Sequence, residues 1–126
     1  MTSDRDWIAR LYLLNAALFV THEIDSGFWR EWELFRLPGS LPGFLVANFV
    51  LILAVQMGFR SVLLRRPTRR LWAAVLAAGG IIAAVLHGAF LIAGLPAFAT
   101  VTSLGLLGVW LAASIAQLAV IWRERA

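Results

Sequence analysis

The chain has 126 residues, of which 61% are hydrophobic and 14% are charged, and its mean hydropathy is +0.83. Soluble domains carry about a quarter charged residues, so the composition argues against a soluble protein and predicts one integral membrane domain over residues 1–126. The net charge of +4 comes from 11 arginines without any lysine. The chain has no cysteine, which excludes disulfides and thiol chemistry.

Four apolar segments predict an all-α bundle of four transmembrane helices, at about residues 7–26, 41–64, 71–94 and 96–122. The last three each have the roughly 20 residues needed to cross about 30 Å of hydrocarbon. The first is less apolar, because its core at 11–20 contains Asn15. It spans only if it carries His22, Glu23 and Asp25 into the outer part of the bilayer. It lacks a small-residue cleavage site, so we expect it to be retained.

Between the first two spans, a short amphipathic helix is predicted at about 28–36. Its aromatic residues recur at i, i+4 and i+7 and therefore share one helical face. These residues are Phe28, Trp32 and Phe35. Aromatic residues beside arginine are typical of a helix lying in the lipid headgroup region. We therefore expect an interfacial anchor with Glu31 and Glu33 in solvent, and the alternative is a lid over the neighbouring polar residues.

The distribution of arginine predicts the orientation. Nine arginines lie on one side if both termini and the loop at 60–70 share it, and two lie on the other side. The nine are Arg5, Arg10, Arg60, Arg65, Arg66, Arg69, Arg70, Arg123 and Arg125, and the two are Arg30 and Arg36. The positive-inside rule then places both termini in the cytoplasm. An arginine cluster between apolar spans is an orientation signal, so nucleic acid is not an expected partner.

The two histidines of the chain are predicted to reach the same depth. His22 lies 15 residues into the first span and His87 lies 17 residues into the third, or about 22 Å and 26 Å from the same side. Small residues beside His87 indicate that it faces the bundle, because such residues let helices approach closely in lipid. Asn48 enters at a similar level from the outer side. We expect the two imidazoles to lie within about 8 Å of each other.

These polar residues admit three interpretations. The first is a divalent metal ion bound by His22, Asp25 and His87, with Glu23 nearby and Asn48 in support, because a histidine and a carboxylate at i, i+3 is a spacing used in helical-bundle metal sites. The second is metal-free acid–base catalysis or proton relay by His22, Glu23, Asp25 and His87 on a lipid-like substrate. The third is an accessory membrane subunit in which these residues only form interhelical hydrogen bonds. Ionisable groups at depth are costly, which favours a functional site, but the pattern leaves open whether the protein is an enzyme.

The segment LYLLNAALFVTHEIDSGFWREWELFRLPG resembles the signature of an uncharacterised family of small bacterial membrane proteins with four spans. The shared pattern is THEIDS-x-x-W-x-x-WELF, with a histidine in the third span. The matching residues are Asn15, His22, Glu23, Asp25, Trp32, Glu33, Leu34, Phe35 and His87. The resemblance implies a bacterial cytoplasmic-membrane protein with membrane lipids around it. It implies no activity, and it leaves a homo-oligomer or another membrane partner open.

Overall fold

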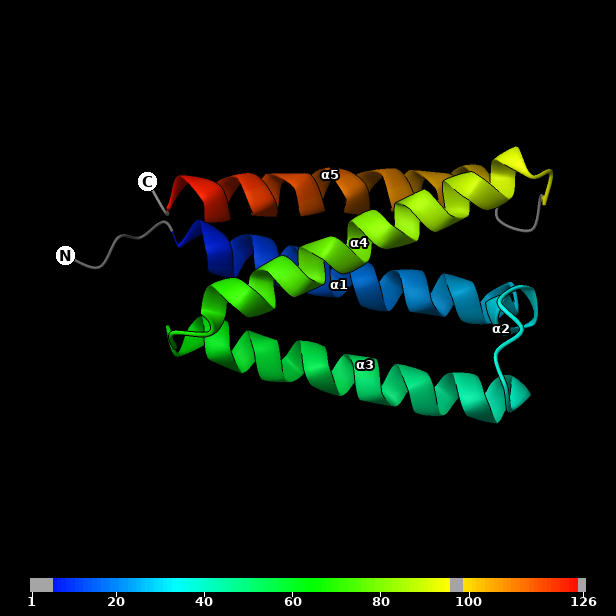
Figure 1. Ribbon diagram of the computed structural model, residues 1–126, viewed down its shortest axis with the longest axis horizontal. Helices are drawn as coiled ribbons and strands as arrows, with labels where there is room; N and C mark the ends of the chain where they lie inside the picture. Colours follow the sequence, from blue (N-terminus) through cyan, green and yellow to red (C-terminus); the bar gives the residue numbers. More distant parts are fainter. Residues whose placement is uncertain (1–5, 96–98, 125–126) are drawn as a thin grey trace.

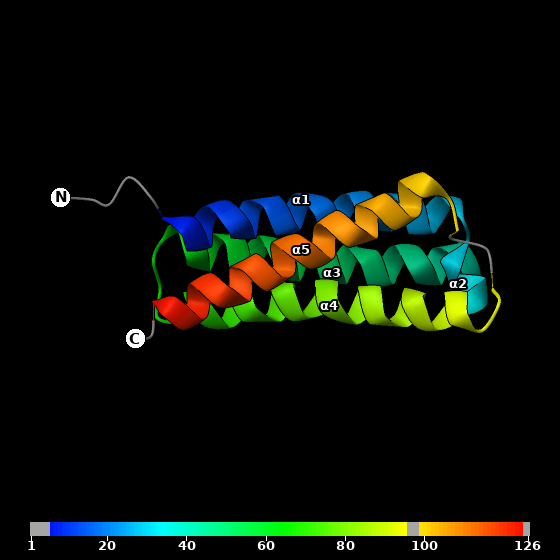
Figure 2. The ribbon, with the colours of Figure 1, turned by 90° about the horizontal axis from the view of Figure 1, so that it is seen from above.

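The computed structural model describes residues 6–95 and 99–124. Five helices occur in these ranges: α1 (Trp7–Phe28), α2 (Glu31–Leu34), α3 (Ser40–Leu63), α4 (Arg69–Ile92) and α5 (Val101–Arg123). The four long helices run back and forth along one axis; α4 is inclined to the others in the view of Figure 1, and α5 is inclined in the view of Figure 2. The described residues contain no strand, so the all-α prediction is confirmed.

Three of the helices, α3, α4 and α5, are long and apolar enough to cross a membrane. The sequence predicts four such spans. Helix α1 has 22 residues but is not among the three, because Arg10, Asn15, His22 and Glu23 reduce its hydropathy. This lower hydropathy distinguishes α1 from the other three long helices.

The helix boundaries differ from the predicted ones at two places. The short helix expected at 28–36 is reduced to α2, and Phe28 is instead the last residue of α1. The last apolar segment becomes helical at Val101, where the Thr100 hydroxyl caps the helix by accepting a hydrogen bond from the Ser103 N–H at 3.1 Å. The predicted start of that segment, at residues 96–98, lies outside the described residues.

A polar network in the middle of the bundle joins α1, α4 and α5. The Asn15 side chain donates to Gln117 and to the Ala113 carbonyl (3.2 Å), and it accepts from the Ser114 hydroxyl (3.0 Å). Gln117 in turn donates to the Ala73 carbonyl at 2.8 Å. Polar groups in apolar surroundings must be satisfied within the protein. This network therefore has the structural role that interhelical hydrogen bonds in a membrane are expected to have.

The helix ends beside the chain termini are joined by arginine contacts. Asp6 caps α1 and pairs with Arg69 (2.5 Å) and Arg65 (3.6 Å) from the α3–α4 connection. Arg70 donates to the Glu124 carbonyl at the end of α5 (2.6 Å). The start of α1, the α3–α4 connection and the end of α5 thus lie at one end of the bundle, and α2 lies at the other (Figure 1).

The close approach of α4 and α5 depends on Gly80. A Cβ atom there would lie 2.2 Å from the Ser114 hydroxyl and 2.9 Å from the Trp110 ring nitrogen. Ser114 cannot rotate away without losing its hydrogen bond to Asn15. At the neighbouring Gly79, a Cβ atom would have nothing within 4 Å.

We therefore expect Gly80→Ala to lower the melting temperature in mild detergent. Overpacking costs about 1–3 kcal/mol, which outweighs the roughly 1 kcal/mol that alanine gains over glycine in a helix. Gly79→Ala is the matched control and should melt at the same or a higher temperature. Equal stability of the two variants would contradict the close α4–α5 contact.

Candidate metal site

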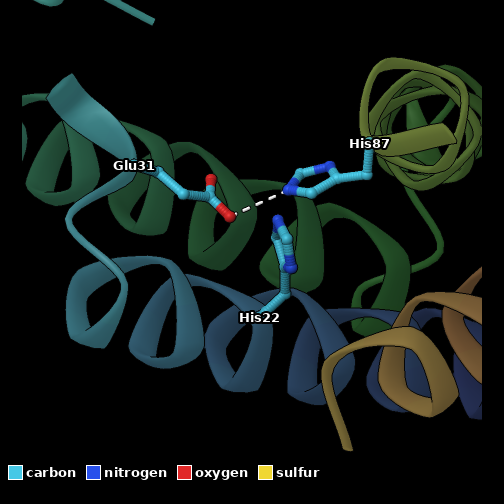
Figure 3. Close-up of side chains that lie close together, drawn as sticks. All are labelled: His22, Glu31 and His87. Atoms are coloured by element: carbon cyan, nitrogen blue, oxygen red, sulfur yellow. Dashed lines mark hydrogen bonds and ion pairs between the residues drawn. The ribbon is translucent and has the colours of Figure 1, made fainter. Parts of the chain in front are cut away.

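The two histidines meet inside the bundle. His22 projects from the second half of α1 and His87 from α4, and their ring centroids lie 5.0 Å apart with the ring planes at 80°. Both side chains are buried, with 4% and 3% of their surface exposed. One ring nitrogen of His22 points toward His87 and toward Glu31, the residue to which His87 is hydrogen-bonded (Figure 3). The expectation that the two imidazoles converge is confirmed.

Glu31 is the third member of the cluster. Its carboxylate lies 2.8 Å from Nε2 of His87, and the residue is only 6% exposed. The prediction that Glu31 is in solvent is therefore wrong, whereas Glu33 is exposed and pairs with Arg30. The difference arises at Arg30, whose left-handed backbone (φ 55°) ends the first helix and redirects the chain. Glu31 consequently faces the bundle.

The aromatic residues of this chain reversal cover the cluster. Trp32 is buried against Phe44 of α3, with ring centroids 5.2 Å apart. Phe35 lies 6.4 Å from the His87 ring and 5.2 Å from Phe90. Phe35 thus covers part of the polar cluster, as the lid alternative for this segment expected. Phe28, the first residue of the predicted aromatic face, is instead 75% exposed.

The hydrogen bonds of His87 fix the position of one of its ring hydrogens. Nδ1 lies 2.7 Å from the Ala83 carbonyl, and because a carbonyl only accepts, Nδ1 carries a hydrogen. Nε2 therefore faces Glu31 either as an acceptor from a protonated carboxyl group or as the donor of an imidazolium. A histidine whose Nδ1–H is held by a backbone carbonyl also presents Nε2 as a metal ligand, the usual arrangement around bound metals.

His22 has unused hydrogen-bonding capacity. Its Nε2 lies 3.4 Å from the Ser26 hydroxyl, and its buried Nδ1 has no hydrogen-bond partner among the described residues. The ring lies against Trp110, with centroids 5.2 Å apart. Leaving a buried polar atom unpaired costs about 1–3 kcal/mol. In a native structure each such unpaired atom needs an explanation, and a binding role of the His22 ring is one.

Three donors of the right kind for a metal ion are thus grouped together. His22, Glu31 and His87 each offer one ligand atom, and these atoms lie within 4.8 Å of one another. Two histidines and a carboxylate form a donor set of catalytic zinc sites, which keep a fourth position open. Tetrahedral zinc places neighbouring ligand atoms roughly 3.3 Å apart. Binding would therefore require the 2.8 Å Glu31–His87 contact to widen by about half an ångström. Any ligand atoms that are as far apart as 4.8 Å would have to move closer together.

The other residues predicted for the site are placed differently. Asp25, the carboxylate expected to bind metal, is half-buried and lies outside the group of three. Glu23 is half-buried and lines the adjoining cavity. Asn48 is buried; its amide donates to the Phe44 carbonyl at 3.1 Å, and its Oδ1 has no partner among the described residues. Helical spacing from His22 identified Asp25, and no such spacing extends across the helix break to Glu31.

A cavity of about 460 Å³ adjoins the cluster between α1, α3 and α4. Its polar lining is concentrated at the α2 end of the bundle. The polar residues there are His22, Glu23, Glu31, Asn48 and His87. Aromatic and aliphatic side chains form nearly all of the remaining wall. The cavity would give a ligand access to an open coordination position.

The fold and the site define a helical protein with apolar helices of membrane-spanning length and a buried His–Glu–His cluster. The chain belongs to a family of unknown function (DUF6713), whose profile matches residues 8–124. No curated protein and no solved structure matches it. Membership in an uncharacterised family, which the resemblance implied, is confirmed.

Removing the Glu31 side chain should destabilise the protein. In Glu31→Ala the Nε2 atom of His87 loses its buried partner, so we expect a loss of about 1–3 kcal/mol and a lower melting temperature in mild detergent. Glu31→Gln should lose much less, because its amide still donates to Nε2. Glu33→Ala is the control, since it removes an exposed pair that contributes about 0–1 kcal/mol. Wild-type stability of Glu31→Ala would contradict a structural contact with His87.

Proposed function

We propose that this protein is a four-span integral membrane protein whose His22, Glu31 and His87 bind a divalent metal ion. The single observation that carries the proposal is the convergence of three buried donors from three separate helices within 4.8 Å. Ionisable side chains in such surroundings are costly and mark functional sites. A bound metal ion would act as a Lewis acid on a membrane-embedded substrate or activate a water molecule.

Helix α1 supplies the fourth span in this proposal. Its 22 residues measure about 33 Å, enough to cross the hydrocarbon region. Its polar residues Asn15, His22 and Ser26 are buried, whereas Leu13 and Ile24 are 57% and 69% exposed. Such a helix places polar groups in the bundle and apolar groups toward lipid, which supports a span despite its lower hydropathy.

The proposed orientation in the bacterial cytoplasmic membrane has both termini in the cytoplasm. It is supported by the arginine-rich end, where Asp6 pairs with Arg65 and Arg69. The positive-inside rule assigns such an end to the cytoplasm. The metal site would then lie in the outer half of the membrane.

Reporter fusions test this orientation. A fluorescent protein fused to the C-terminus should be fluorescent, and alkaline phosphatase, which is active only outside the cytoplasm, should be inactive there. The same phosphatase inserted between α2 and α3 should be active. An active phosphatase at the C-terminus would overturn the orientation.

A second candidate function, acid–base catalysis without a metal ion, is supported by the 2.8 Å contact between His87 and Glu31. A histidine and a carboxyl group that share one proton can act as an acid–base pair without a metal ion. In that case His22 would orient the substrate or relay the proton. A purely structural role is less well supported, because the Asn15 network already joins the helices at mid-bundle.

Metal analysis of the protein purified in mild detergent distinguishes these functions. We expect about one zinc or similar divalent ion per chain, lost in Glu31→Gln and His87→Ala. Glu31→Gln is the decisive variant, because it keeps a hydrogen bond to His87 and removes only the charged ligand. Asp25→Asn should retain the metal, since Asp25 lies outside the cluster.

Two results would overturn the metal site. Metal retained at full occupancy in Glu31→Gln would exclude this ligand set. Wild-type protein that stays metal-free after addition of zinc, cobalt or manganese would favour the acid–base pair instead.

A further inference from the structure

The cavity beside the cluster extends parallel to the helices. Its lining extends along α4 from Trp72 to His87, 15 residues apart or about 22 Å. On α3 it extends from Phe44 to Val55, 11 residues or roughly 16 Å. A volume of about 460 Å³ is in the usual range for a small-molecule site. Its extension parallel to the helices suits a chain-like ligand better than a compact one.

The cavity opens sideways between α3 and α4. Several side chains that line it are also about half exposed at the surface. Leu51 of α3 is 48% exposed, and Val75 and Ile82 of α4 are 55% and 58% exposed. If these helices span the membrane, this opening faces hydrocarbon and not water. A ligand would therefore enter from the lipid.

The two ends of the cavity differ in polarity. The end beside α2 contains the cluster, together with Glu23 and the unpartnered amide oxygen of Asn48. Among the described residues that line the cavity, none is arginine. Phosphate groups in proteins are usually bound by arginine or lysine, and the described lining of this cavity offers neither. This end instead suits hydroxyl or carbonyl groups without charge.

We propose that the cavity binds one uncharged, single-chain amphiphile. Its hydrocarbon chain would lie along α3 and α4 toward Trp72, and its hydroxyl or ester group would contact His22, Glu31 and His87. This inference rests on the proposed function for its polar end, because the same cluster would act on the head group. It adds the class of substrate and the side from which that substrate enters.

Photolabelling tests the site directly. The probe is a monoacylglycerol that carries a diazirine near the end of its acyl chain, added to the purified full-length protein. We expect adducts on the residues at the deep end of the cavity, around Val55, Trp72 and Leu76. A lysophosphatidylglycerol with the same chain and diazirine should label these positions at least several-fold less.

Filling the cavity should block labelling. Gly79 lines the cavity, and a Cβ atom added there would meet nothing within 4 Å, so Gly79→Leu should fold and reduce deep labelling about tenfold. Ala54→Leu, on the opposite wall, is the second blocking variant. Gly105→Leu is the matched control, because Gly105 is equally open but lies on α5 outside the cavity, and it should be labelled like wild type.

Three results would overturn the inference: labelling spread over lipid-facing surfaces, labelling unchanged in both blocking variants, or equal labelling by the charged probe. The metal content of the same samples tests the proposed function separately. Deep labelling of a metal-free wild type would support the amphiphile site and overturn the metal site. Metal bound to the wild type without deep labelling would support the metal site and overturn the amphiphile site.

Discussion

The hydrogen bond between His87 and Glu31 holds together the end of the bundle on which the candidate site depends. In apolar surroundings, a polar side chain must find its partner within the protein, because no water is available. His87 is buried on α4, and Glu31 reaches it only because the chain reverses after α1. That reversal also places Trp32 against α3. One polar contact thus holds α2 beside the cluster (Figure 3).

The Asn15 network and the histidine cluster differ in how many of their buried polar atoms have a hydrogen-bond partner. The amide groups of Asn15 and Gln117 bond to one another and to backbone carbonyls, so this network only needs to hold helices together. Around His22, by contrast, buried ring nitrogens of His22 and Trp110 have no hydrogen-bond partner among the described residues. Unpaired buried groups are costly. The difference favours a binding role for the histidine cluster and a structural role for the Asn15 network.

The composition of α1 follows from this division. Helices α3, α4 and α5 present mainly apolar side chains and qualify as membrane spans by composition alone. Helix α1 instead contributes Asn15 to the structural network and His22 to the cluster, and both are buried. A helix that supplies polar groups to the interior has a low average hydropathy even when its outer face is apolar. The same helix also borders the cavity, which connects the cluster to the apolar surface between α3 and α4.

Periodicity and composition determined the helical class, the approximate position of each long helix and the common level of His22 and His87 along the bundle, because these properties depend on spacing along single helices. They could not identify Glu31. That residue follows a helix break, and the direction of the chain after Arg30 depends on its left-handed backbone and on the packing of Trp32 against Phe44. Helical spacing therefore indicated Asp25, which lies within α1, as the carboxylate partner, whereas long-range packing brought Glu31 to His87. The cavity likewise depends on how α3 and α4 diverge, which only the tertiary structure decided, because the angle between two helices is set by contacts that no single segment contains.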